Sequence, residues 1–157
     1  MDEFGEAVRR HFVLMADTRL HLKPGVIELL DVLDELRLPR AIATSSKHDT
    51  VQHHLAAHAL HGRFHAVVAQ GDYAASKPAP DPYLNAAKLL GVDPRSCLAL
   101  EDSYAGVQSA STAGMTTIMV PDLLQPTDEI RRLCAHVAAN LHEVRGLISD
   151  ASLRRVA

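Results

Sequence analysis

The sequence of 157 residues is long enough for one domain with a single core. Its net charge of −3 argues against a nucleic-acid-binding protein, which usually carries a basic face. No apolar run approaches the length that crosses a bilayer, and the first ten residues are too charged for a secretory signal. Cys97 and Cys134 lie far apart in apolar surroundings, which favours free buried thiols in a reducing cytoplasm over a disulfide.

The predicted elements begin with a segment of helical character over residues 2–15 and continue as helices that alternate with short apolar strands. We expect further helices over 26–36, 48–59, 81–90, 104–113 and 141–148, and strands over 41–43, 66–69, 97–100, 116–120 and 136–138. This alternation predicts an α/β fold, a Rossmann-like parallel sheet with helices on both faces. In such sheets, ligands bind outside the carboxyl ends of the strands.

Three hydroxyl residues, Thr44, Ser45 and Ser46, directly follow the predicted strand over 41–43. A hydroxyl at a strand end, followed by backbone N–H groups at the start of a helix, is well suited to hold a phosphate group. The alternative is that Ser45 or Ser46 merely caps the next helix, which is the commoner role for such residues.

Lys77 lies in the segment that follows the strand over 66–69, next to Pro78 and close to Pro80. The two prolines restrict the backbone and would hold the ammonium group in a defined place. A fixed cation near a transferring phosphoryl group stabilises the charge that develops there. The alternative is a solvated surface lysine, as most lysines are.

Glu101 and Asp102 are adjacent acids at the end of the apolar strand over 97–100. They repel each other unless a positive group lies nearby, and Mg²⁺ is a suitable partner because it binds carboxylates and keeps several waters. The alternative, evenly balanced on this motif alone, makes Asp102 the N-cap of the helix that begins near Tyr104 and leaves Glu101 solvated.

Three segments, AIATSSKHD, SKPAPDPYLNAAKLLGV and LALEDSYAGVQSASTAGM, resemble the second, third and fourth motifs of the haloacid dehalogenase superfamily in order and spacing. The residues of these motifs are most similar to the beta-phosphoglucomutase-like and sugar-phosphate phosphatase branch. The resemblance spans about residues 20–140. It implies a magnesium-dependent phosphohydrolase acting on a small phosphorylated metabolite, with a sugar phosphate as the expected substrate. A phosphosugar mutase of the same family and a non-catalytic phosphate-binding module are the alternatives.

The resemblance also assigns roles to the matched positions. Thr44 would hydrogen-bond the transferring phosphoryl group, helped by the backbone N–H of Ser45. Lys77 would neutralise the phosphate and the attacking carboxylate. Asp102 would bind Mg²⁺, with Glu101 as a second ligand or as the partner of a metal-bound water.

Further positions receive less specific roles from the resemblance. Ser46, Lys47 and His48 match a stretch that contacts substrate in some relatives, and Gly106 would let its helix pack closely. In the family, phosphoryl transfer passes through an aspartyl-phosphate, which water then hydrolyses.

The family's nucleophile belongs to a first motif of the form Asp-x-Asp, at the end of the first and central strand. No two aspartates in this sequence stand two positions apart. We therefore expect a chain that lacks the first strand and most of the helical cap, with 1–20 as a cap remnant and 21–157 as the C-terminal part of the core. Such a chain would be inactive alone and would leave strand edges unpaired at the middle of the sheet.

Five histidines gather at His53, His54, His58, His61 and His65. No carboxylate stands among them in zinc-hydrolase spacing, so a solvated, histidine-rich surface is favoured over a metal site. The predicted partner is a small phosphorylated metabolite, with neither nucleic acid nor membrane as a partner.

Overall fold

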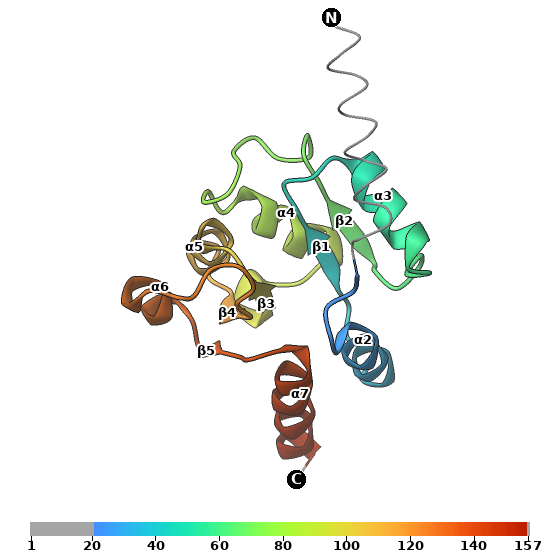
Figure 1. Cartoon of the computed structure of the whole chain (residues 1–157), viewed down its shortest axis with the longest axis vertical. Coiled ribbons are helices and arrows are strands. Elements are labelled where there is room, and N and C mark those ends of the chain that lie inside the picture. Colours follow the sequence, from blue (N-terminus) through green and yellow to red (C-terminus); the bar gives the residue numbers. More distant parts are fainter. Residues whose placement is uncertain (1–20, 157) are drawn as a thin grey trace, which may run out of the picture.

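The computed structural model describes the backbone of residues 21–156 and the side chains of residues 21–151 (Figure 1). The predicted helix over 2–15 and the predicted cap remnant over 1–20 lie outside the described residues. The helices are α2 (Val26–Glu35), α3 (His48–Ala57), α4 (Asp81–Leu90), the 3₁₀ helix η1 (Pro94–Ser96), α5 (Tyr104–Thr112), α6 (Asp128–Leu133) and α7 (Leu141–Val156). The strands are β1 (Ala41–Ala43), β2 (Ala66–Val68), β3 (Leu98–Glu101), β4 (Thr116–Met119) and β5 (His136–Val137).

All strand pairs in the described part of the chain are parallel, as the α/β prediction requires. They form two sheets, one of order β1-β2 and one of order β3-β4-β5, where the sequence predicts one. The sheet is divided because β1 and β3 do not hydrogen-bond to each other, so each has a single partner strand among the described residues. This division lies where the sequence predicts unpaired edges.

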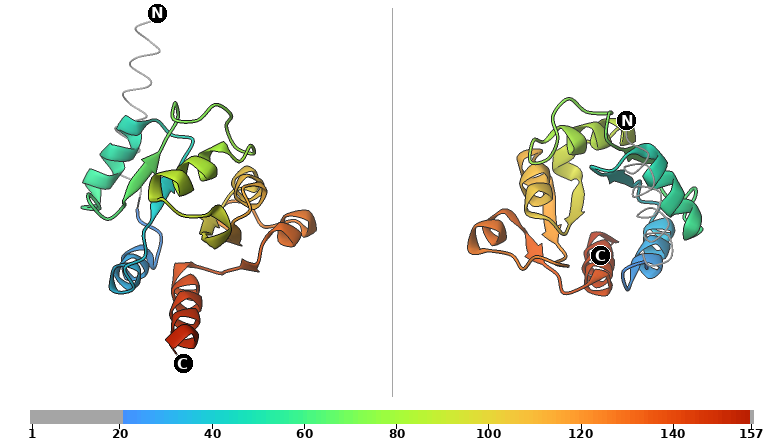
Figure 2. Two further views of the ribbon diagram at one scale, coloured as in Figure 1. Left: turned by 180° about the vertical axis from the view of Figure 1, so that it is seen from behind. Right: turned by 45° about the horizontal axis from the view of Figure 1, so that its top comes forward.

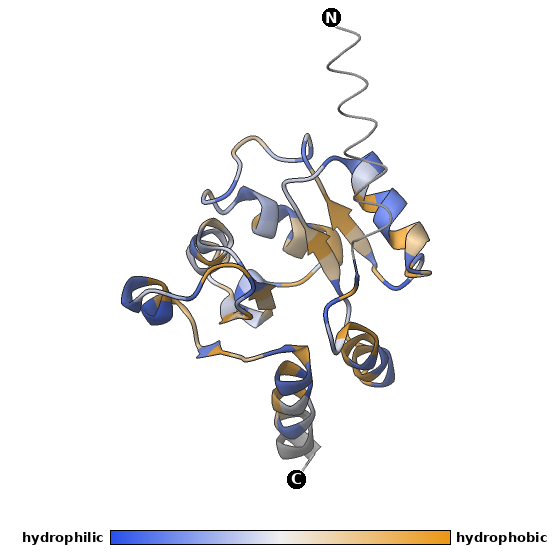
Figure 3. Cartoon of the chain, in the orientation of Figure 1, coloured by the Kyte–Doolittle hydropathy of each residue, from blue (hydrophilic) through white to orange (hydrophobic). Residues whose placement is uncertain are grey.

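Helices cover both faces of the strands, and two of them join the sheets. Leu30 of α2 packs with Val51 and Leu55 of α3 over β1 and β2, whereas Leu29 of the same helix packs with Ile118 of β4. On the other side, α4 contacts β1, β2 and α5. Figure 2 shows α2 beside α7 and α5 beside β4, and Figure 3 shows apolar residues on β1 and β2. The molecule is therefore held together by helix packing across the divided sheet.

Most element boundaries agree with the sequence prediction to within one or two residues. The helix α4 begins at Asp81 and ends at Leu90, and it is followed by Gly91, whose left-handed φ of 68° suits glycine. The strand β3 is shifted by one residue, so that Glu101 is its last member and not the first residue after it. The helix α7 runs to Val156, eight residues beyond the expected end at 148. Among the described residues, no helix is both long and apolar enough to cross a membrane.

Candidate functional site

A cavity of about 350 Å³ opens at the carboxyl ends of β1 and β3, where the two sheets face each other. Its walls come from both sheets, from the segment that precedes α2 and from the first residue of α7. The lining residues are Lys23, Ala43, Thr44, Ser45, Lys77, Leu100, Glu101, Asp102, Ser103, Val120 and Leu141. Five of the residues predicted from the sequence therefore share one cavity: Thr44, Ser45, Lys77, Glu101 and Asp102. Ser46 and Lys47, also predicted, are not among the lining residues.

The Thr44 turn is held at the end of β1 by backbone hydrogen bonds. The Thr44 N–H donates to the carbonyl of Val68 at 2.9 Å, and the Thr44 hydroxyl oxygen accepts from the Ser46 N–H at 3.1 Å. The helix α3 begins after Lys47, with no side-chain cap. The capping role considered for Ser45 or Ser46 is thus wrong, and the Thr44 hydroxyl keeps its proton for another acceptor.

Lys77 is held in place and is not solvated, so the surface-lysine alternative is wrong. Its ammonium donates to the carbonyl of Ala43 at 3.0 Å and forms an ion pair with the Glu101 carboxylate. Only 12% of its side chain is exposed. The Lys77–Pro78 peptide bond is cis. The contacts with Ala43 and Glu101 fix the ammonium between the end of β1 and the end of β3.

Glu101 is buried among hydrogen-bond donors, with 7% of its side chain exposed. Besides Lys77, it accepts from the Tyr83 hydroxyl at 2.5 Å and from the Ser103 hydroxyl at 3.0 Å. Burial alone would raise the pKa of the Glu101 carboxyl, but the Lys77 ammonium and these hydrogen bonds outweigh it and lower that pKa. Burial and the Glu101 carboxylate raise the pKa of Tyr83, which stays a neutral donor. Glu101 therefore remains charged beside Lys77.

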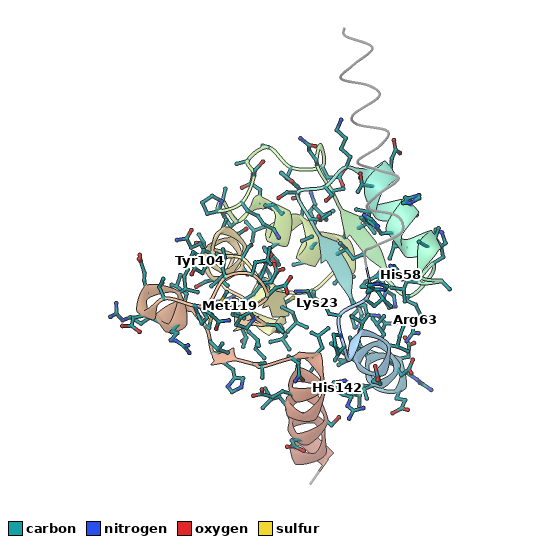
Figure 4. The ribbon with its side chains drawn as sticks, in the orientation of Figure 1. Lys23, His58, Arg63, Tyr104, Met119 and His142 are labelled. Atoms are coloured by element: carbon teal, nitrogen blue, oxygen red, sulfur yellow. The ribbon has the colours of Figure 1, made fainter. Side chains whose placement is uncertain are left out.

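Asp102 differs from its neighbour because 53% of its side chain is exposed. The N-cap of α5 is Ser103, whose hydroxyl accepts from the Gly106 N–H at 3.1 Å, so the capping alternative for Asp102 is wrong. The nearest cation is Lys23, with its ammonium 3.7 Å from the Asp102 carboxylate and 2.8 Å from the Asp122 carboxylate. Lys23 lies between the two sheets in Figure 4.

The oxygen donors around Asp102 suit Mg²⁺ in type but are few in number. Within residues 21–151, no three His, Cys, Asp or Glu side chains gather where they could hold one metal ion. A single carboxylate still fits Mg²⁺, which commonly takes one or two carboxylates and completes its shell with water and substrate phosphate. An ammonium already attracted to Asp102 shows that this carboxylate faces a position that favours a cation.

His48 lies at the start of α3 and pairs with Asp72. Its Nε2 is 2.7 Å from the Asp72 carboxylate, which also accepts from the Ala69 N–H at 2.8 Å. The Ala69 hydrogen bond, supported by His48, lowers the pKa of Asp72. The pair joins the start of α3 to the turn after β2, and His48 is not among the residues that line the cavity.

Three residues of the site were not singled out from the sequence: Lys23, Tyr83 and Asp122. Tyr83 lies within the third motif segment, as the third residue of α4. Asp122 stands two residues after Val120, outside the three motif segments. Lys23 stands before Pro24, where the sequence indicates only an interruption between helices. The signal that could have found it is its charge, because an acidic strand end needs a cation nearby. Cys97 and Cys134 are free and only partly buried.

A hydroxyl, an ammonium and a carboxylate at the carboxyl edge of parallel strands are typical of α/β enzymes that act on phosphorylated ligands. Residues 2–120 match the family model described as haloacid dehalogenase-like hydrolase, and the chain belongs to that family.

Relatives and solved structures agree with this assignment. Protein CbbY of Rhodobacter capsulatus is 40% identical over 72% of this chain and 51% of its own length. Hexitol phosphatase B of Escherichia coli K12 is 36% identical over 73% of this chain and 51% of its own. A HAD family hydrolase from Deinococcus radiodurans, solved with phosphate and sodium, superposes with a TM-score of 0.81 at 26% identity, over 98% of this chain and 69% of that one. The chain spans about half the length of the curated relatives it matches.

Proposed function

We propose that these residues are the phosphate-holding and metal-holding part of a magnesium-dependent phosphohydrolase that acts on a small phosphorylated metabolite. The observation that carries the proposal is the convergence of Thr44, Lys77 and Asp102 on one cavity at the edge of the strands. A sugar phosphate is the proposed substrate class, supported by the relative named hexitol phosphatase B. The two free thiols support a reducing, cytoplasmic location.

Each polar group has a separate role in holding the phosphoryl group. The Thr44 hydroxyl, whose oxygen already accepts from Ser46, donates to a phosphate oxygen, and the Ser45 N–H provides a second donor. The Lys77 ammonium neutralises charge on the same group. Because Lys77 is fixed by Ala43 and Glu101, it needs little reorganisation when charge develops.

Asp102 is the proposed ligand of Mg²⁺, because its carboxylate is exposed to the cavity while that of Glu101 is engaged with Lys77, Tyr83 and Ser103. Bound Mg²⁺ would supply charge neutralisation of the phosphoryl oxygens. Glu101, on this proposal, contributes by fixing Lys77, or through a water of the metal shell.

The attacking carboxylate is the part that the described residues do not supply. The cavity walls hold two carboxylates, of which Glu101 is paired with Lys77 and Asp102 is assigned to the metal. We propose that a strand between β1 and β3 brings the nucleophile, since both strands have an unpaired edge there and the relatives are about twice as long as the part they share with this chain. This chain alone would then be inactive.

The test is the release of inorganic phosphate from p-nitrophenyl phosphate and from a panel of sugar phosphates by the complete protein, with Mg²⁺ and with EDTA. Asp102→Ala and Lys77→Ala should each lower kcat/KM by about 10²- to 10³-fold. Asp128→Ala, on α6 outside the cavity lining, is the matched control and should leave the rate unchanged. Hydrolysis that is insensitive to EDTA and to Asp102→Ala would refute the metal role, and an isomeric sugar phosphate as the product would favour a mutase.

A further inference from the structure

The Lys23 ammonium lines the cavity but has no role in the phosphate binding proposed above. It faces two carboxylates, Asp122 at 2.8 Å and Asp102 at 3.7 Å, which come from the ends of different strands. Lys77, the other cation in the cavity lining, is already paired with Glu101. Lys23 is therefore the cation that neutralises Asp102 in this structure.

The three side chains are each about half exposed, with 43% of Lys23, 53% of Asp102 and 52% of Asp122 accessible. Exposed ion pairs are weak and their partners exchange readily. An ammonium in this setting can be displaced by a divalent cation, which binds a carboxylate more strongly than a solvated lysine does. The Lys23 ammonium is closer to Asp122 than to Asp102, so Asp122 holds it away from the Asp102 carboxylate.

We propose that Lys23 is an internal counter-ion of the metal site, which competes with the divalent cation for Asp102, and that Asp122 is the positioning residue that draws Lys23 aside. The proposal rests on the proposed function, because it takes Asp102 as the metal ligand. Lys23 leads directly into Pro24 and α2, so the ammonium is attached to a segment whose backbone is restricted.

The competition predicts effects of opposite sign for two neighbouring substitutions. Lys23→Met removes the competing cation and should tighten divalent-cation binding by about three- to tenfold, the range expected for one charge near a solvated carboxylate. Asp122→Asn removes the nearer partner of Lys23, which then pairs with Asp102, so binding should weaken by a similar factor.

The double variant separates this mechanism from a general charge effect. If Asp122 acts through Lys23, Asp122→Asn should change the affinity little in the Lys23→Met background. If Asp122 acts only by its own charge on the metal, Asp122→Asn should weaken binding equally in both backgrounds. Lys88→Met, on the exposed side of α4, is the matched control for net charge and should leave the affinity unchanged.

The experiment is a titration of this chain with Mn²⁺, a probe that carboxylates bind as they bind Mg²⁺, with free Mn²⁺ measured by electron paramagnetic resonance. Tighter binding by Lys23→Met, weaker binding by Asp122→Asn and loss of the Asp122 effect in the double variant would support the proposal. Equal affinities of the native chain and Lys23→Met, with binding lost in Asp102→Asn, would overturn the counter-ion role alone. Binding that survives in Asp102→Asn would instead overturn the metal role of Asp102 on which the proposed function depends.

Discussion

Gly106→Ala is the substitution whose effect on the free energy of unfolding is most closely defined by the structure. Gly106 lies in the first turn of α5, directly against the Glu101 carboxylate. A Cβ atom at this position would lie 2.0 Å from Glu101 Cδ and from its Oε2, so the carboxylate has to move. Moving it breaks the contacts with Lys77, Tyr83 and Ser103, because all three converge on the same two oxygens.

The magnitude follows from two opposing effects. Breaking a buried ion pair and leaving its partner uncompensated costs about 3–5 kcal/mol. Replacing glycine by alanine within a helix returns about 1 kcal/mol through helix propensity. Gly106→Ala should therefore lower the free energy of unfolding by about 2–4 kcal/mol.

The assay is equilibrium unfolding in urea, followed by circular dichroism. Gly146→Ala in α7 is the matched control, since a Cβ at Gly146 meets no atom within 4 Å, and it should raise the stability by up to about 1 kcal/mol. In a Glu101→Ala background, Gly106→Ala should no longer lower the free energy of unfolding, because no carboxylate remains to be displaced. Equal stability changes for Gly106→Ala and Gly146→Ala would refute the packing described around Glu101.

Two other substitutions test single contacts. Tyr83→Phe keeps the ring near Lys77 but removes the hydroxyl that donates to Glu101 at 2.5 Å. It should lower the free energy of unfolding by about 1.5–3 kcal/mol in the same urea assay. An unchanged unfolding midpoint would contradict that hydrogen bond. The pKa of Asp72 lies below its ordinary 3.8, chiefly because of the Ala69 N–H, so the carboxylate stabilises the fold above pH 3.8 and this contribution is lost as the pH falls through the folded-state pKa. His48→Ala should raise that pKa only part of the way to 3.8 in a ¹³C NMR titration, and a full return to 3.8 would show that the Ala69 bond is absent.

The sequence predicts the fold class and the places where the chemistry gathers, because both depend on local patterns. Apolar runs of strand length separated by amphipathic helices define the α/β order, and glycine at position 91 marks the end of α4. The roles of Thr44 and Lys77 could be weighed against capping and solvation only in the structure, since the sequence cannot show which donors an oxygen already accepts from.

The remaining features depend on contacts between distant segments. Glu101 and Asp102 are neighbours of the same charge in the sequence, yet one is buried against Lys77 and the other is half exposed beside Lys23. Glu101 is the last residue of β3 and Asp102 follows it, so their side chains leave the extended chain on opposite sides. Lys23 and Asp122 are almost a hundred residues apart, so no local pattern could bring them together.

The proposed function requires that Thr44, Ser45 and Lys77 form a phosphate-binding site in the cavity between the two sheets. Its most direct test is a titration of this chain with inorganic phosphate, followed residue by residue in ¹H–¹⁵N NMR spectra. The amide signals of Thr44 and Ser45 should shift most, and Lys77→Met should weaken the binding. Shifts confined to the arginine-bearing helix α6, or binding unaffected by Lys77→Met, would contradict it.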